Sequence, residues 1–91
     1  MAVVLEQAAS VLQKPPEQLL QESLWAYVSQ EKRLAHLDIA DIQDRYRVST
    51  PQELAQRIET GEVYSHPAWE DLIEWENLLD YIKRLDRLWA S

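Results

Sequence analysis

Cysteine and phenylalanine are absent from this 91-residue chain, and glycine occurs only once. Without cysteine, the chain can form neither disulfide bonds nor thiolate metal sites. One glycine is too few for the glycine-rich loops that cradle phosphates in nucleotide-binding proteins. The apolar runs are only a few residues long, and the N-terminus lacks the basic flank and apolar segment of a secretory signal. We therefore expect a cytoplasmic protein that does not contact a membrane.

Positive charge is also scarce, since nine lysines and arginines are outnumbered by sixteen aspartates and glutamates, for a net charge of −7. Residues 1–48 hold seven acids and five bases, whereas residues 49–91 hold nine acids and four bases. Nucleic acid repels an acidic chain that lacks a local basic patch. The few basic pairs here alternate with carboxylates, so the composition disfavours DNA binding while leaving it an alternative.

Leucine, alanine, glutamate and glutamine are abundant, and hydrophobic residues make up 46% of the chain. These residue types favour helix, and the length is that of one domain. We therefore predict a single all-α domain over residues 1–91. A chain this short has a small hydrophobic core, and self-association is a common way to supplement it.

Proline, glycine and capping residues predict four helices, in the order short, long, short and long. Pro15 and Pro16 separate the first helix from the second. Thr50 and Glu53 form a capping box before the third, and Gly61 suits a left-handed cap after it. Pro67 opens the fourth. The expected helices cover residues 5–13, 16–46, 51–60 and 67–89.

Two details lie outside these helices. Residues 2–4 have the composition of a very short strand. Val63 and Tyr64, in the connector before the last helix, are expected to pack inward.

The long helix over residues 16–46 carries an apolar stripe and would be about 45 Å long, more than a small monomer can easily cover. We therefore interpret residues 1–48 as a helix-turn-helix dimerisation half in which this helix packs against its copy in a homodimer. The side chains expected at the dimer interface are Leu20, Leu24, Tyr27, Val28, Leu34 and Ile39.

Residues 58–82 contain seven carboxylates and four large aromatic side chains but no lysine or arginine. Most apolar residues of the amphipathic last helix fall on one stripe, in which Trp75 and Trp89 are expected to be core. Trp69, Ile73 and Tyr81 lie off it, and tryptophan and tyrosine are common interface anchors. An alternative is that these three belong to the core. We interpret residues 49–91 as an acidic partner-binding half, with Trp69, Glu70, Ile73, Glu74, Asp80 and Tyr81 as the contact residues.

Catalytic and metal-binding patterns are not evident. His36 and His66 are isolated in the sequence, and no nucleophile stands near a base. Glu70 and Glu74 share a helix face, but no Glu-x-x-His motif accompanies them. We therefore expect no catalytic residues, no cofactor and no metal ion, and the chain is not expected to be an enzyme.

The segment LEQAASVLQKPPEQLLQESLWAYVSQE resembles the helix-turn-helix part of ribbon-helix-helix antitoxins. The segments RYRVSTPQELAQRIETGEV and HPAWEDLIEWENLLDYI are similar to the tails of small bacterial, cyanobacterial and archaeal proteins regarded as antitoxins. The resemblance implies a dimer through the N-terminal half and a toxin-contacting C-terminal half. That family reads DNA with a basic β-ribbon before the first helix, whereas only Met1 to Val4, without a basic side chain, precede Leu5 here.

The function that we predict is a non-enzymatic protein-binding module, foremost the antitoxin of a toxin–antitoxin pair that occludes a basic toxin. An acidic surface with aromatic anchors suits a basic protein partner. An oligomeric helical adaptor and a ribbon-helix-helix-type transcriptional repressor are the alternatives.

Overall fold

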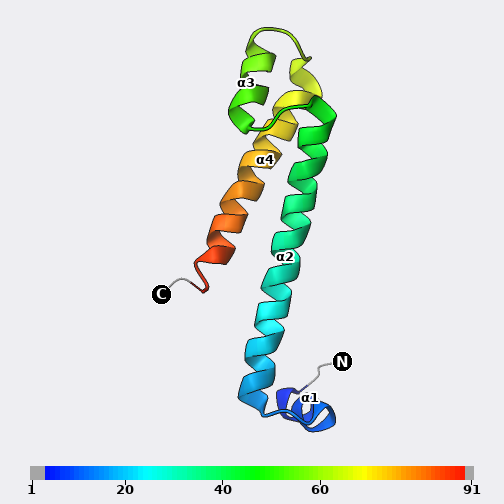
Figure 1. Ribbon diagram of the computed structural model, residues 1–91, viewed down its shortest axis with the longest axis vertical. Coiled ribbons are helices and arrows are strands. Elements are labelled where there is room, and N and C mark those ends of the chain that lie inside the picture. The colour runs from blue at the N-terminus through cyan, green and yellow to red at the C-terminus, as the bar shows by residue number, and fades with distance from the viewer. Residues whose placement is uncertain (1–3, 90–91) are drawn as a thin grey trace. The chain divides into compact units, whose positions relative to one another are not determined.

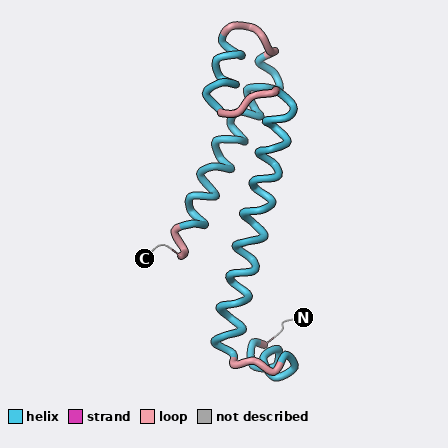
Figure 2. Tube along the Cα trace, viewed as in Figure 1, coloured by secondary structure: helices cyan, strands magenta, loops and turns pink. Residues whose placement is uncertain are grey.

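The computed structural model describes residues 4–89, which are mostly helical (Figures 1 and 2). The helices are α1 (Leu5–Leu12), α2 (Pro16–Tyr46), α3 (Pro51–Glu59) and α4 (Ser65–Asp86). These described residues include no strand, and the all-α prediction is confirmed. The short strand considered for residues 2–4 lies outside the described residues except for Val4, whose extended backbone (φ −85°, ψ 135°) precedes α1.

The chain consists of two compact units, residues 1–31 and residues 32–91, so α2 contributes to both. The halves predicted from the sequence, residues 1–48 and 49–91, divide the chain at a later point.

The first unit contains α1 and the start of α2. α1 ends at Gln13, which adopts the left-handed conformation (φ 57°, ψ 48°), and the Lys14 N–H bonds to the Ala9 carbonyl at 2.9 Å. The Lys14 ammonium forms an ion pair with the Glu22 carboxylate, which also accepts a 2.7 Å hydrogen bond from Gln18. These contacts fasten the proline turn to α2. The hydrogen bond from Lys14, and then that from Gln18, lower the pKa of Glu22.

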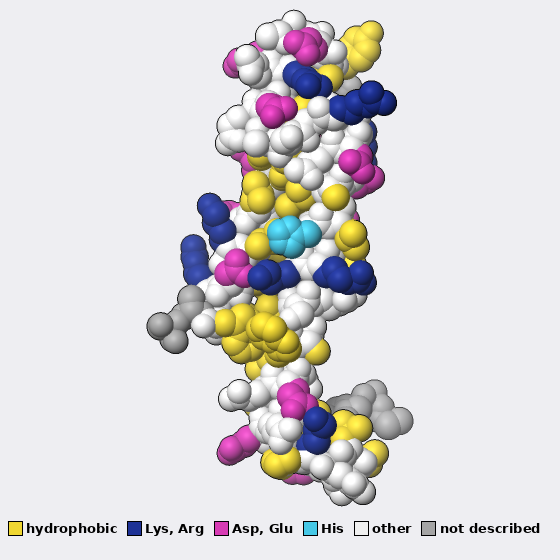
Figure 3. Space-filling view, in the orientation of Figure 1, with side chains coloured by type: hydrophobic (Ala, Val, Ile, Leu, Met, Phe, Trp, Pro, Cys, Tyr) yellow, Lys and Arg dark blue, Asp and Glu magenta, His cyan; other side chains and the backbone are white. Residues whose placement is uncertain are grey.

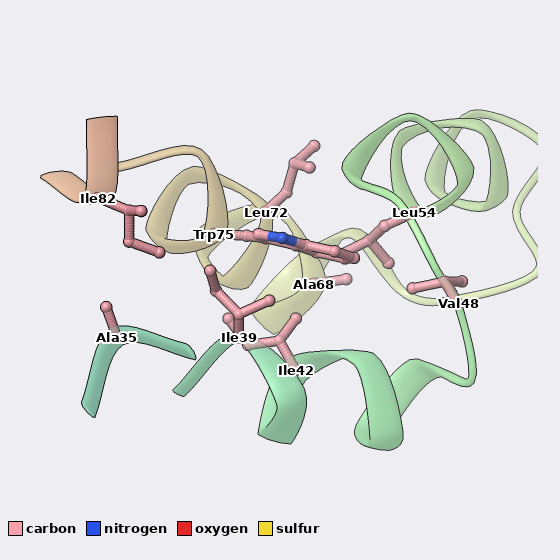
Figure 4. Packing of buried hydrophobic residues seen from close by; sticks show 9 residues of the cluster. All are labelled: Ala35, Ile39, Ile42, Val48, Leu54, Ala68, Leu72, Trp75 and Ile82. Carbon is pink, nitrogen blue, oxygen red and sulfur yellow. The ribbon is translucent and has the colours of Figure 1, made fainter. Parts of the chain in front are cut away.

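The second unit contains the hydrophobic core, which is drawn from the rest of α2, from α3 and from α4. Trp75 is 2% exposed and lies among the other core side chains (Figure 4). Ile42 and Leu54 are also fully buried. The remaining members of this cluster are Ala35, Ile39, Val48, Ala68, Leu72 and Ile82. Together they hold α2, α3 and α4 in one packed group.

α3 has the termini that its sequence predicts. The Thr50 hydroxyl accepts a hydrogen bond from the Glu53 N–H at 3.1 Å. The Glu53 carboxylate reaches back to the N–H of Ser49 at 3.4 Å, one residue earlier than a capping box requires. At the other end Gly61 has φ 79°, and the Glu62 N–H bonds to the Arg57 carbonyl at 2.9 Å. This left-handed cap at Gly61 is as predicted.

The connector before α4 differs in part from expectation. Val63 packs against the core, but Tyr64 is 90% exposed, so the prediction that both point inward is wrong for Tyr64. Tyr64 has extended backbone angles (φ −67°, ψ 137°), and successive side chains of an extended chain point to opposite sides. His66 is also extended (φ −118°, ψ 123°), so regular helix begins at Pro67 as predicted.

The apolar stripe of α4 is mostly buried. Leu72, Trp75, Ile82 and Leu85 are buried, and Leu78 packs against the core. Trp89 is 44% exposed, so its assignment to the core is wrong. α4 ends at Asp86 rather than near residue 89, and the helical spacing that placed Trp89 on the stripe no longer applies there.

Candidate protein-interaction surface

The outward side of α4 carries two exposed apolar side chains, Trp69 and Ile73. They are 55% and 44% exposed, and residues four apart on a helix are neighbours on its surface. At about 100° per residue, Trp69 lies about 60° and Ile73 about 100° around the helix from Leu72, the nearest buried position to each. Trp69 and Ile73 therefore form a small apolar ridge on the second unit.

Carboxylates lie along one side of this ridge and further along α4. Glu70, Glu74, Glu76 and Asp80 are all exposed, and residues 58–82 contain no lysine or arginine. The His66 Nδ1 lies 3.5 Å from the Glu70 carboxylate, a pair that is ionic only when the histidine is protonated. Basic residues return at Lys83 and Arg84, in the last turn of α4. The ridge consequently lies within a stretch of one charge sign.

Tyr81 is less available than the other predicted contact residues. Its side chain is partly buried, and the Arg84 guanidinium carbon lies 5.4 Å from the centre of its ring. Such a cation–π contact covers one face of the ring. Of the six predicted contact residues, five are exposed and one is partly covered. We call the five exposed residues the acidic face: Trp69, Glu70, Ile73, Glu74 and Asp80.

Asp71 has a different position from the other acids of α4. Its carboxylate accepts a hydrogen bond from the Tyr46 phenol and one from the Arg45 guanidinium at 2.8 Å, and its side chain is only 15% exposed. Arg45 also bonds to Asp41 at 2.8 Å. Asp71 therefore joins α4 to α2 and does not belong to the acidic face.

Two members of this network, Tyr46 and Arg45, have a raised pKa. Burial raises the pKa of the Tyr46 phenol, and the hydrogen bond to Asp71 raises it further. The hydrogen bond to Asp71 is also the largest cause of the raised pKa of Arg45. The sequence holds a signal for this role, because Asp71 falls on the wheel between Leu78 and Ile82, inside the apolar stripe.

Of the six residues predicted at a dimer interface, four are exposed and two are buried. In the first unit Leu20, Leu24 and Tyr27 are 47%, 51% and 58% exposed, whereas Val28 is buried. In the second unit Leu34 is 43% exposed, whereas Ile39 belongs to the core. The surface of Ile39 is therefore already covered within its own chain.

Residues 4–89 enclose no pocket and hold no group of three or more histidine or acidic side chains that could bind a metal ion. His36 is exposed on α2. None of the described helices combines the length and the apolar character needed to cross a bilayer.

Fold and surface together define a small helical protein with an exposed, acidic and aromatic helix face. The chain belongs to the uncharacterized protein MJ0235 family, whose family model matches residues 1–89. No curated protein and no solved structure matches it. The family match does not bear on the resemblance to ribbon-helix-helix antitoxins, which stays a prediction.

Proposed function

We propose that this chain is a non-enzymatic protein-binding module whose acidic face contacts a basic protein. The particular role that we propose is that of an antitoxin, which neutralises its toxin by covering the toxin's working surface. The single observation that carries the proposal is the exposure of Trp69, 55%, beside Ile73 in a stretch of helix without lysine or arginine.

The apolar ridge supplies the affinity in this proposal. Trp69 and Ile73 are 55% and 44% exposed, so each has apolar surface that a partner could cover. Burying a large apolar side chain contributes roughly 1.5–3 kcal/mol, and tryptophan is enriched among the few residues that dominate binding energies. The ridge therefore suits an apolar pocket on a partner.

The carboxylates determine which kind of partner is favoured. Glu70 and Glu74 lie beside the ridge and Asp80 lies two turns beyond it; all three are exposed, so they would meet the partner at the rim of the contact. Charges of opposite sign at a rim raise the association rate and exclude wrong partners more than they raise affinity. A pocket bordered by lysine and arginine fits this face, whereas a phosphate backbone would be repelled.

The antitoxin role rests on the resemblance of both halves of the sequence to antitoxin proteins. Toxins that act on nucleic acid need a basic surface, and an acidic helix with an aromatic anchor would occlude such a surface. An adaptor that binds a harmless basic protein would use the same face, so an experiment must separate the two roles.

The test begins with capture of partners from a lysate of the native host. The wild-type chain is compared with the double variant Trp69→Ala, Ile73→Ala. Trp25→Ala is the matched control, because Trp25 is a tryptophan of similar exposure, 58%, in the other unit. We expect one basic protein to be retained by the wild type and the control and to be lost with the double variant.

The captured protein is then expressed alone and together with each form of the chain. Growth arrest that is relieved by the wild type but not by the double variant is the outcome expected of an antitoxin. A captured protein that is harmless alone would identify an adaptor instead. Undiminished capture by the double variant, with helicity unchanged by circular dichroism, would rule out the acidic face as the binding surface.

A further inference from the structure

The apolar ridge on α4 is the first part of a longer exposed stripe. From Trp69 onwards, alternating steps of four and three residues along α4 reach only exposed side chains. Such steps keep side chains on one side of a helix, here within about 80° of arc, and helices that pair along their length contact each other at this spacing. Arg87 caps α4 with helical backbone angles (φ −66°, ψ −22°), so the spacing still applies there. The members of this outer stripe are Trp69, Ile73, Glu76, Asp80, Lys83 and Arg87.

Side chains of different chemistry follow one another along the outer stripe in three blocks. Trp69 and Ile73 are apolar, the next two members are acidic, and the last two are basic. Charges of one sign also gather elsewhere, since several lysine and arginine side chains lie at the level of a histidine on the face in Figure 3. A partner that covers the whole outer stripe therefore meets an apolar, a negative and a positive block in turn, over about 27 Å.

The order of the charged blocks does not stabilise the free helix. Glu76 and Asp80 lie four residues apart, as do Lys83 and Arg87, and like charges at this spacing disfavour a helix. The helix dipole favours bases in the last turn, which accounts for the positive block. Its effect is confined to the end turns, so it does not account for Glu76 and Asp80 in the middle of α4. Opposite charges on a partner would relieve both repulsions.

The charged members of the outer stripe are not used within the chain. Over residues 4–89, none of these four side chains takes part in an ion pair or a hydrogen bond. Two neighbouring charges off the stripe are used. The Asp86 carboxylate pairs with Lys32 of α2 at 2.6 Å, and the Arg84 guanidinium lies over the Tyr81 ring. The negative and positive blocks are therefore both available to a partner.

The spacing and the charge order favour an elongated partner. An apolar pocket would cover Trp69 and Ile73 alone, whereas a helix laid along α4 at a small crossing angle also reaches the basic block. We propose that the basic partner docks one helix along the outer stripe, and that this helix carries apolar, then basic, then acidic side chains in the order that matches α4. The docking helix rests on the proposed function, since it belongs to the partner that contacts the acidic face. It adds two acidic side chains to the contact surface of an otherwise basic protein.

The first experiment measures the affinity of the purified captured partner for the full chain at low salt. The double variant Lys83→Gln, Arg87→Gln removes the positive block. We expect its dissociation constant to rise about 3- to 10-fold, because two exposed ion pairs are lost. Gln52→Glu, Gln56→Glu is the matched control, since it makes the chain more acidic by the same two charges at exposed positions of α3. The control should not weaken binding.

The sign of this change separates the docking helix from the proposed function alone. If negative charge alone attracted the partner, removing Lys83 and Arg87 would strengthen binding. Unchanged or tighter binding of Lys83→Gln, Arg87→Gln, while Trp69→Ala, Ile73→Ala still loses the partner, would overturn the docking helix and leave the proposed function intact. Failure to capture any basic protein would overturn both.

The second experiment tests whether the docked segment is a helix. A carbodiimide joins a lysine amine directly to a carboxylate, so Lys83 reports the partner acid opposite it and Arg87→Lys reports the next one. The two partner carboxylates should lie three or four residues apart in one helix. Carboxylates two residues apart, as in a strand, or in separate segments, or no cross-link from Lys83, would overturn the docking helix. In a mixture of isotope-labelled and unlabelled chains, a cross-link from Lys83 to Glu76 or Asp80 of another copy would show that the chain pairs with itself instead.

Discussion

Trp75 and Trp69, six residues apart on α4, lie in opposite environments. Trp75 is 2% exposed at the centre of the core, whereas Trp69 is 55% exposed on the outward side of the helix. Six residues correspond to about one and two-thirds turns, so the two indole rings leave the helix in different directions. One tryptophan therefore holds the second unit together, and the other is available to a partner.

The two tryptophans should respond differently to truncation. We expect Trp75→Ala to reduce the free energy of unfolding by about 3–5 kcal/mol, because it opens a large cavity in the core. Trp69→Ala should change it by less than about 0.5 kcal/mol, as is usual for surface positions. Urea denaturation followed by circular dichroism measures both. Similar losses for the two variants would show that Trp69 also supports the fold.

The hydrogen bond between Tyr46 and Asp71 should contribute to stability. Tyr46→Phe removes the phenol that donates to the Asp71 carboxylate and leaves the ring in place. We expect a loss of about 1–3 kcal/mol in the free energy of unfolding, because the acceptor is charged and its side chain is only 15% exposed. Asp71→Asn combined with Tyr46→Phe should cost less than the sum of the single changes. Additive losses would mean that the two groups do not interact.

The raised pKa of the Tyr46 phenol predicts that stability changes at alkaline pH. Burial, and then the hydrogen bond to Asp71, raise the pKa of Tyr46 in the folded chain. The unfolded chain loses this proton first, from about pH 10, so the stabilisation is complete below that pH and falls as the pH rises towards the higher folded pKa. Unfolding measured from about pH 8 to 11 should show the wild type losing stability faster than Tyr46→Phe. Parallel pH profiles would contradict this.

Gly61 should be sensitive to any side chain for reasons of backbone conformation alone. Its φ of 79° is disfavoured for residues with a Cβ atom, yet a Cβ built there meets no other atom within 4 Å. We expect Gly61→Ala to cost about 1–2 kcal/mol, and Gly61→Asn to cost less because asparagine tolerates this conformation. Thermal unfolding of the three proteins gives the comparison. An alanine variant as stable as the wild type would mean that the α3 cap rearranges freely.

The charges of the acidic face should act mainly on the rate at which a basic partner binds. The triple variant Glu70→Gln, Glu74→Gln, Asp80→Asn should lower the association rate by about 10-fold at low salt and change dissociation less. The difference should shrink as salt is added, because exposed charges are screened. Stopped-flow mixing with the captured partner measures both rates. Asp38→Asn, Asp44→Asn, Glu59→Gln is the control, since it removes as much charge from other exposed positions.

The helix ends are the part of the fold that local chemistry specifies. Proline cannot continue a preceding helix but suits the first turn of a new one, which explains Pro16, Pro51 and Pro67. Thr50 caps the backbone within its own turn, and Gly61 supplies a left-handed residue. Such signals operate over three or four residues, so they are readable without a fold. The two sides of α4, with Trp75 buried and Trp69 exposed, follow likewise from helical periodicity.

Helical periodicity no longer predicts which side chains are buried where a helix ends, and it cannot identify contacts with distant residues. Trp89 leaves the stripe because α4 stops at Asp86, and Tyr64 points outward because Val63 takes the place against the core. The spacing of Asp71 places it inside the apolar stripe, but only the fold shows that its partner is Tyr46, twenty-five residues earlier. Val48 lies outside any helix and is nevertheless buried, because it packs within the core cluster.

The sequence by itself therefore determined the helices, their ends and the acid-rich stretch from which the candidate surface is built, because backbone capping and helical spacing are local. Only the tertiary structure decided which residue Asp71 bonds to and that Tyr64 and Trp89 stay in water. Those outcomes depend on which segments come into contact, and burial and hydrogen bonding between distant residues have no fixed spacing along the chain.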